Sequence, residues 1–359
     1  MIPIYKPYLE GNEKKYVNEC LDSTWISSKG SFINRFEEAV REYIGVKYSS
    51  SCSNGTVALD LAFKALDIGN GDEVITTAFT YIASTNAILI NKAVPVFVDI
   101  EDSSWNIDIS KIETKINSKT KAILISNVYG FLPDIYKLKH LCEQNNIYLI
   151  EDAAESFGTR IGAKYSGSFG DVSTFSFFGN KTITTGEGGM VLTSDQRVYK
   201  KIEILKNQGN NPDIRYHHDI LGYNYRMTNI QAAIGLGQIE NIDLILKKKK
   251  EIFRFYQNRL KDIATFQTST VSDQHPSYWI IAILLKNTNS LEKIKIKLEE
   301  NNIEHRPLFP PVDSMKFYQK AEDLNLTYDI FQKGLCLPSY PSLTENDLSI
   351  ICNVILNEN

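Results

Sequence analysis

The feature that most limits how this chain can fold is the alternation of short apolar runs with helical patterns between residues 74 and 152. We expect strands at residues 74–78, 94–99, 122–128 and 147–152, with helices at 84–91, 109–116 and 135–145. Strands that are apolar along their whole length are typical of a sheet that helices cover on both faces. The sequence therefore predicts right-handed β-α-β units and a mostly parallel sheet.

The remaining segments extend this α/β pattern in both directions. Two strands joined by a glycine-rich link, at 171–177 and 189–193, suggest a hairpin-like turn. Other expected elements are helices at 31–44, 53–66, 195–208, 228–239, 242–260 and 291–301, a strand at 278–285 and a last helix after Pro341. Because 359 residues exceed one core of ordinary size, we expect a large domain at 1–240, with an N-terminal arm at 1–30, and a small C-terminal α/β domain at 241–359.

Composition excludes several classes of protein. A net charge of −4 and a pI near 5.8 argue against a nucleic-acid partner. The five cysteines are widely spaced and form no C-x-x-C pair, which excludes a zinc ribbon, and we expect no metal site. The start of the chain has no apolar leader and no run of eighteen apolar residues occurs, so we expect a cytoplasmic protein without membrane contact.

Four features fall where a parallel sheet binds ligands, beyond the carboxyl ends of its strands. Tyr81 and Asp152 follow two of the strands, and Gly55-Thr56 begins a helix whose free amides suit a phosphate. Lys181 lies in a turn of aromatic, hydroxyl and glycine residues. Three of these features also have an ordinary interpretation: Asp152 could cap a helix, many helices begin like the one at Gly55-Thr56 and bind nothing, and Lys181 could be a solvated lysine.

Taken together, these residues are the parts that pyridoxal 5′-phosphate (PLP) requires. Its phosphate needs amides and hydroxyls, its ring a flat neighbour, its pyridine nitrogen an anion, and its aldehyde a lysine. Burial would lower the pKa of that lysine and free its nucleophile. A nicotinamide dehydrogenase would need a G-x-G-x-x-G turn after the first strand, which residues 53–57 do not provide.

Along essentially its whole length the sequence resembles the DegT-type nucleotide-sugar aminotransferases, which are fold-type-I PLP enzymes. The resemblance is carried by Ser53-Asn54-Gly55-Thr56, Glu151-Asp152-Ala153-Ala154-Glu155, the stretch from Phe175 through Lys181 to Gly189, and Gly222-Tyr223-Asn224-Tyr225-Arg226-Met227-Thr228. It implies an aspartate-aminotransferase-like fold with a seven-stranded sheet. A deoxygenating branch of the family has histidine in place of the lysine, so Lys181 disfavours a dehydratase.

The resemblance also implies a role for each site residue. Lys181 would bond the cofactor and carry the proton, Asp152 would pair with the ring nitrogen, and Glu155 would lie near the ring hydroxyl. Tyr81 would stack on the ring, and Gly55, Thr56 and Ser176 would hold the phosphate. Asn224 would reach the phosphate of a neighbouring subunit, which implies a homodimer with shared active sites. Contacts with the sugar nucleotide are expected from Trp25, Ser27, Asn180, His305, Arg306 and Tyr318.

The implied reaction is a transamination in two halves. L-glutamate gives its amino group and leaves as 2-oxoglutarate, and a nucleotide-linked keto-deoxysugar accepts the group. We expect the acceptor to be GDP-4-keto-6-deoxy-D-mannose and the product GDP-perosamine, a precursor of surface polysaccharide such as O-antigen. A UDP- or dTDP-linked 4-keto or 3-keto sugar is the alternative, because the lysine motif does not distinguish these acceptors. A non-catalytic PLP-binding regulator is a remote alternative, since it would lack Lys181 or carry an added DNA-binding module.

Overall fold

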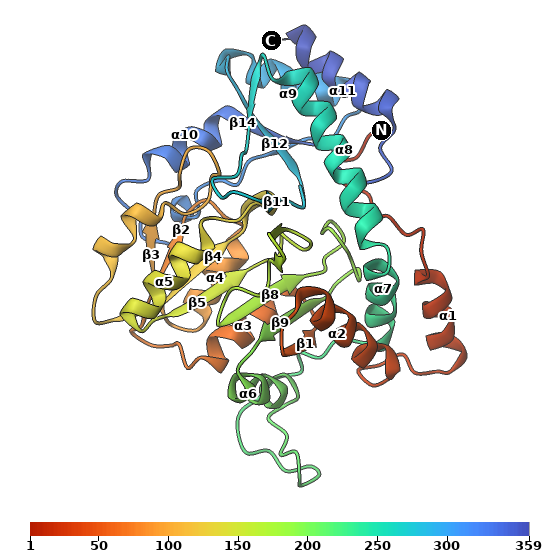
Figure 1. Cartoon of the computed structure of the whole chain (residues 1–359), viewed down its shortest axis with the longest axis vertical. Coiled ribbons are helices and arrows are strands. Elements are labelled where there is room, and N and C mark those ends of the chain that lie inside the picture. The colour runs from red at the N-terminus through yellow and green to blue at the C-terminus, as the bar shows by residue number, and fades with distance from the viewer. Residues whose placement is uncertain (359) are drawn as a thin grey trace.

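The computed structural model describes residues 1–358. A seven-stranded sheet runs through the larger part of the molecule (Figure 1). The strand order of this sheet is β1-β9-β8-β5-β4-β2-β3. The strands are β1 (Tyr48–Cys52), β2 (Glu73–Thr77), β3 (Val94–Val98), β4 (Thr120–Ser126), β5 (Tyr148–Asp152), β8 (Val172–Ser176) and β9 (Gly189–Thr193). Strands β2, β3, β4, β5 and β8 pair in parallel, whereas β9 is antiparallel to both β8 and β1. The predicted seven-stranded, mostly parallel sheet is confirmed.

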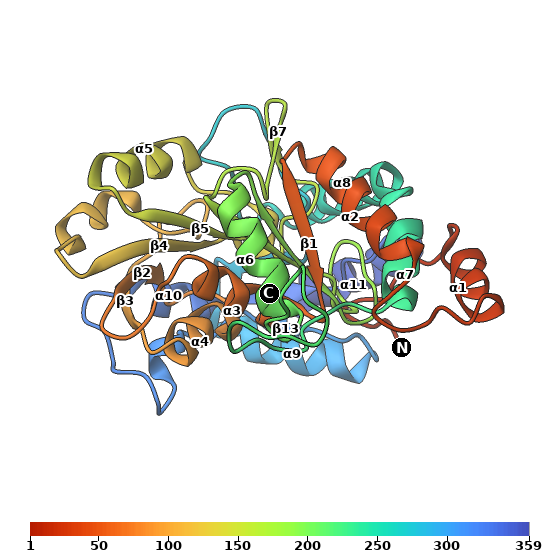
Figure 2. The ribbon, with the colours of Figure 1, turned by 90° about the horizontal axis from the view of Figure 1, so that it is seen from below.

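Helices cover both faces of this sheet because successive strand residues point to opposite sides. In β4, Ala122 and Leu124 face one helical layer, and Ile123 and Ile125 face the other. The first layer is α3 (Gly55–Ala65), α4 (Ile82–Ile90) and α6 (Gln196–Lys206). The second is α2 (Ser31–Ile44), α5 (Ile135–Asn145) and α7 (Asn229–Ile239), with α1 (Glu13–Asp22) packed on α7. Figure 2 shows α5 on one side of β4 and β5 and α3 and α4 on the other.

The C-terminal part contains an antiparallel sheet of its own. Its order is β10 (Ala264–Phe266), β12 (Ile281–Leu285), β14 (Gly334–Leu337) and β13 (Arg306–Pro307). Helices α8 (Ile242–Leu260), α9 (Leu291–Glu300) and α11 (Glu345–Glu358) pack around it, and α10 (Asn325–Lys333) precedes β14. Helix α8 buries Ile242 and Ile245 beside α7, and Ile252 and Tyr256 beside the antiparallel sheet. The domain boundary at residue 240 stays a prediction.

One predicted helix is wrong. Residues 109–116 form two 3₁₀ turns, η1 (Ile109–Lys111) and η2 (Glu113–Lys115), instead of an α-helix. The segment is short and rich in β-branched residues, and such a segment nucleates an α-helix poorly. The other 3₁₀ turns are η3 (Val128–Gly130), η4 (Thr288–Ser290) and η5 (Val312–Ser314).

The sequence analysis did not assign several short strands. Strand β1 at the sheet edge is polar, and β6 (Arg160–Ile161), β7 (Lys164–Tyr165) and β11 (Gln274–His275) form a small separate sheet. Strands of two residues are too short to show a periodic pattern. Within residues 1–358, no helix combines the length and the apolar composition needed to cross a bilayer.

Candidate active site

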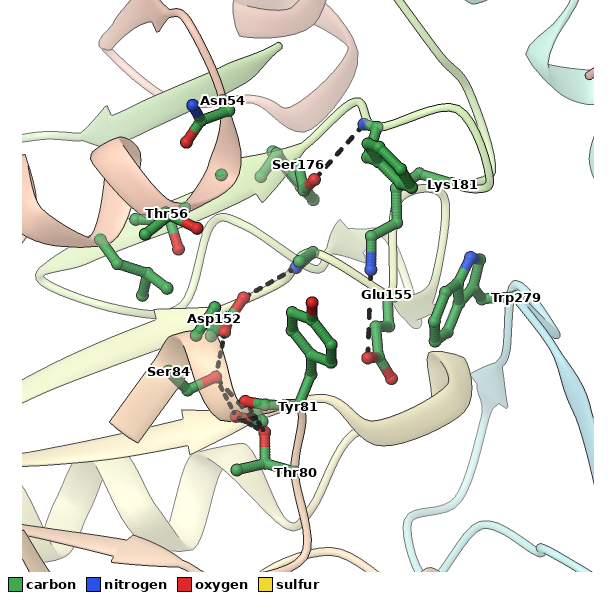
Figure 3. Close-up of a pocket in the computed structure, with 18 of the residues that line it drawn as sticks. Asn54, Thr56, Thr80, Tyr81, Ser84, Asp152, Glu155, Ser176, Lys181 and Trp279 are labelled. Carbon is green, nitrogen blue, oxygen red and sulfur yellow. Dashed lines mark hydrogen bonds and ion pairs between the residues drawn. The ribbon is translucent and has the colours of Figure 1, made fainter. Parts of the chain in front are cut away.

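A cavity of about 510 Å³ opens at the carboxyl edge of the parallel strands (Figure 3). Nine of the residues that the sequence analysis selected line it: Gly55, Thr56, Tyr81, Asp152, Glu155, Ser176, Asn180, Lys181 and Arg306. Eight of them come together because β1, β2, β5 and β8 run in the same direction, so that the ends of these strands and the segments after them meet at one edge, whereas Arg306 belongs to β13 in the C-terminal part.

Lys181 lies in the turn that follows β8, and its side chain is buried. Its Nζ is 4.0 Å from Glu155 Oε1 and 3.9 Å from the centre of the Trp279 ring. Burial lowers the pKa of this lysine, although the charges of Glu155 and Asp152 oppose the change. The lysine therefore keeps more of the neutral, nucleophilic amine at neutral pH than an exposed lysine does.

Asp152 is the last residue of β5, and its carboxylate is buried beside the cavity. Its Oδ2 accepts a hydrogen bond from Ser84 Oγ on α4, and its Oδ1 accepts one from the Ala154 amide at 3.1 Å. Burial raises the pKa of Asp152, while the bond from Ser84 lowers it. A fixed, buried carboxylate of this kind is suited to a positively charged partner, which would restore its ionised form.

Glu155 lies three residues after Asp152, and the backbone of Tyr129 binds its carboxylate. The Tyr129 amide donates to Glu155 Oε2 at 2.8 Å, and Tyr129 has a left-handed backbone with φ of 55°. Burial raises the pKa of Glu155, and the charge of Lys181 lowers it. The unusual backbone of Tyr129 thus presents an amide to the carboxylate that neighbours Lys181.

The start of α3 forms one wall of the cavity. The side chain of Asn54 caps the helix by accepting from the Val57 amide at 3.0 Å. Among the described residues, neither the Gly55 nor the Thr56 amide has a hydrogen-bond partner. A Cβ on Gly55 would lie 2.7 Å from the Cβ of Ser176, so only glycine lets the ends of α3 and β8 approach this closely. Free amides at a helix N-terminus attract an anion.

Aromatic rings form another wall of the cavity. Tyr81, which immediately precedes α4, is 58% exposed, and its ring points into the cavity (Figure 3). Its ring centre lies 6.1 Å from that of Phe309, which stacks on Tyr129 at 5.1 Å. An exposed ring beside a cavity provides a surface on which a flat ligand can stack.

Five predicted residues do not line the cavity. Asn224, Trp25 and Ser27 are exposed on other segments, and His305 Nε2 lies 3.3 Å from Glu299 Oε1. Tyr318 is 8% exposed and packs against Phe97, and its hydroxyl donates to Thr85 Oγ1 at 2.8 Å and Asn86 Oδ1 at 3.0 Å. The fold of one chain therefore does not bring these five to the cavity, and their roles stay predictions.

Trp279 and Ser84 are among the site residues that the sequence analysis did not identify. Trp279 comes just before β12, where the apolar pattern predicted only a strand. Ser84 lies one turn into α4 from Tyr81, so its position on the same helix face could have identified it.

The residues of the cavity fit PLP. The Gly55 and Thr56 amides provide free donors for a phosphate, and Thr174 Oγ1 and Asn180 Oδ1 are buried beside the cavity without a partner in residues 1–358. Lys181 and Asp152 supply the amine and the carboxylate, and in Figure 3 both point toward the space beside Tyr81. All the chemical groups that the cofactor needs therefore face one cavity.

Comparison with known proteins agrees with this geometry. Residues 7–356 match the model of the DegT/DnrJ/EryC1/StrS aminotransferase family. The chain is 46% identical to GDP-perosamine synthase of Escherichia coli O157:H7, covering 99% of this chain and 97% of that protein, and 44% identical to GDP-perosamine synthase of Vibrio cholerae, covering 99% of each.

Among solved structures, the PLP-form of the putative sugar aminotransferase Spr1654 from Streptococcus pneumoniae is 25% identical, with a TM-score of 0.92 over 98% of this chain and 97% of that chain. The match to the family model spans nearly the whole length, and the fold and the cavity agree with it. The chain therefore belongs to the DegT/DnrJ/EryC1/StrS aminotransferase family and is a PLP-dependent enzyme.

Proposed function

We propose that this enzyme transfers an amino group from L-glutamate to C4 of GDP-4-keto-6-deoxy-D-mannose. The products would be 2-oxoglutarate and GDP-perosamine, a precursor of surface polysaccharide such as O-antigen. The observation that carries the proposal is the buried Lys181 amine in one cavity with the Asp152 carboxylate. The choice of acceptor is supported by the two GDP-perosamine synthases that share 44–46% of their residues with this chain.

The proposed roles follow from the positions of the side chains. PLP, when bound, supplies the electron sink for moving the amino group. Lys181 Nζ would hold the cofactor and then move a proton to and from the substrate carbon. Asp152 would keep the ring nitrogen protonated, and Glu155 would face the ring hydroxyl. The start of α3 and Ser176 would bind the phosphate, and Tyr81 would stack on the ring.

The sugar nucleotide would enter past Asn180 and Arg306, which line the cavity. The side chain of Arg306 is 48% exposed and its guanidinium lies 3.5 Å from Glu304 Oε1, so it is available to an anionic ligand at the rim. Trp25, Ser27, His305 and Tyr318 complete the proposed set of substrate contacts. For Tyr318, the hydrogen bonds to α4 would have to be exchanged for a bond to the substrate.

We further propose that two copies form a homodimer that shares its active sites, with Asn224 reaching the phosphate in the other copy. Asn224 follows a loop that projects beyond α6 (Figure 1). This loop exposes Tyr216 at 81% and Leu221 at 83%, and Trp25 is 56% exposed. Large apolar side chains exposed in this way are typical of protein interfaces.

We also propose that the enzyme is located in the cytoplasm. We propose in addition that the chain forms a large domain at residues 1–240 and a small domain at residues 241–359.

Two measurements test the function. The first is Lys181→Ala, which should abolish turnover and the absorbance band of the lysine-bonded cofactor; full turnover in this variant would refute the role of Lys181. The second is a coupled assay with glutamate and a panel of GDP-, UDP- and dTDP-linked keto sugars. We expect the GDP sugar to give the highest kcat/KM, and a faster UDP or dTDP sugar would replace the proposed acceptor.

A further inference from the structure

A second buried lysine, Lys249 on α8, lies behind the site. It is 1% exposed, and its Nζ donates to the backbone oxygen of Trp279 at 3.0 Å and of Ser339 at 2.7 Å. Within residues 1–358 no carboxylate forms an ion pair with it, and burial lowers its pKa to about 7. A lysine amine held in the interior by neutral groups alone is costly, and none of the roles assigned to the site residues uses it.

The backbone around the reactive lysine is held by two aromatic donors. Trp279 Nε1 donates to the Asn180 oxygen at 2.6 Å, and the Tyr5 hydroxyl donates to the Lys181 oxygen. These are successive carbonyls of the turn that carries the reactive amine. In addition, Lys181 Nζ lies 3.9 Å from the centre of the Trp279 ring, and Figure 3 shows Trp279 beside the Lys181 side chain.

Lys249 contacts both of these donors. It bonds the backbone of Trp279 directly, and its Nζ lies 5.3 Å from the centre of the Tyr5 ring. Tyr5 belongs to the N-terminal segment, Trp279 precedes β12, and Ser339 follows β14. The Lys249 amine therefore contacts three segments that are far apart in the sequence, and two of these segments bond the backbone of residues 180 and 181.

We propose that Lys249 is a positioning residue that fixes the Lys181 turn through Trp279 and Tyr5. This inference rests on the proposed function, because it assumes that Lys181 is the reactive amine. Covalent capture of a cofactor and proton transfer both require an amine placed to within a fraction of an ångström. If Lys249 were lost, both aromatic donors would be less firmly placed and the turn would gain mobility.

The competing interpretation is that Lys249 only stabilises the fold. Lys206 provides the matched control, because it is also a buried lysine and donates to a backbone oxygen, that of Ser51, at 3.3 Å. It pairs with Glu203 of α6 and Glu37 of α2 beside the edge strand β1, and it does not line the cavity. Lys206→Met thus reports the effect of losing a buried lysine without disturbing the aromatic donors.

The first experiment measures hydrogen exchange of the amides of residues 178–187 in the cofactor-free protein. Lys249→Met should speed exchange in this turn by about tenfold, which corresponds to ~1.4 kcal/mol of local opening. Lys206→Met should leave it within about twofold of wild type. Equal exchange in the two variants would overturn the proposal.

The second experiment measures how fast PLP becomes bonded to Lys181, by borohydride reduction followed by mass spectrometry of the lysine peptide. Capture should slow by about tenfold in Lys249→Met relative to Lys206→Met, since a misplacement of about 1 Å has effects of this order or larger. An unchanged capture rate would count against the proposal.

Two milder variants keep the proposal testable if Lys249→Met does not fold. Tyr5→Phe and Trp279→Phe each remove one donor to the turn, and each should raise exchange at residues 178–187. If neither does so, the aromatic donors do not fix the turn and the proposal fails. Exchange in the cofactor-free protein is independent of turnover, so retained activity in Lys181→Ala would refute the proposed function without altering this result.

Discussion

At the scale of single residues, the charge of Asp152 should decide the rate. Burial raises the pKa of this carboxyl, and a protonated ring nitrogen beside it would return it to the ionised form. Asp152→Asn keeps the size and the bond from Ser84 but loses the charge. We expect kcat to fall by about 10²- to 10³-fold, the usual cost of removing one electrostatic contact from a reacting group. Steady-state kinetics measure this, and a fall of less than about threefold would exclude a charge-based role.

Lys249 should make stability depend on pH. Burial lowers its pKa from 10.5 in the unfolded chain to about 7 in the folded chain. Between these values the unfolded chain binds the additional proton, so this group makes folding more favourable as pH rises. Relative to Lys249→Met, wild type should gain ~2 kcal/mol of unfolding free energy between about pH 7.5 and 9. Urea unfolding at the two pH values measures the difference, and a difference that does not change with pH would mean that Lys249 stays charged when folded.

The sequence could identify the residues at strand ends but not their distant partners. Asp152 and Lys181 follow β5 and β8 directly, so a correct strand pattern places them at the edge where ligands bind. Trp279 and Tyr5 bond the same turn from 99 and 176 residues away in the chain. Periodicity describes local structure only, and it gives no information about pairings over such separations.

At the scale of elements, the start of α3 should control cofactor affinity. Gly55→Ala would place a Cβ 2.7 Å from that of Ser176 and push α3 away from β8. We expect PLP to bind about tenfold more weakly, or ~1.4 kcal/mol, because the free amides would no longer converge on its phosphate. Gly69→Ala is the matched control, since its Cβ would meet nothing closer than the Asn91 oxygen at 3.6 Å. Fluorescence titration with PLP measures both, and equal affinities would mean that the phosphate binds elsewhere.

The elements that the sequence predicted well are those with long apolar patterns. The parallel strands and helix α5 lie close to their predicted ranges, because their buried faces repeat with a clear period. Strand β1 carries three serines in a row, and its pairing with β9 depends on backbone hydrogen bonds that its side chains do not reveal. The apolar residues of the 109–116 segment have helical spacing, but the segment forms two 3₁₀ turns. Apolar spacing alone does not provide enough helix propensity for an α-helix.

At the scale of the whole molecule, the cavity draws residues from both sheets. Lys181 and Asp152 come from the end of the parallel sheet, while Trp279 and Arg306 come from segments of the antiparallel sheet. Helix α8 links the two regions, with its first turns in one core and its later turns in the other. Movement of the C-terminal part relative to the parallel sheet would therefore change the shape of the site.

The proposed sharing of active sites between two copies makes a prediction that only a dimer can satisfy. If Asn224 serves the site of the partner copy, Asn224→Ala and Lys181→Ala should each be nearly inactive alone, for different reasons. In a mixed dimer, one site has both defects and the other has neither, because Lys181 of one copy meets Asn224 of the other. Random re-association makes about half of the dimers mixed, so about a quarter of all sites should become active.

The experiment is to unfold the two variants together, refold them and measure turnover against each variant refolded alone. Recovery near a quarter of wild-type activity supports sharing, whereas recovery near zero means that Lys181 and Asn224 act within one copy. Leu221→Asp is the second variant, because a charge on this 83% exposed side chain should weaken an apolar interface. It should lower the mass measured by light scattering and reduce activity together, and a fully active monomer would refute the shared site.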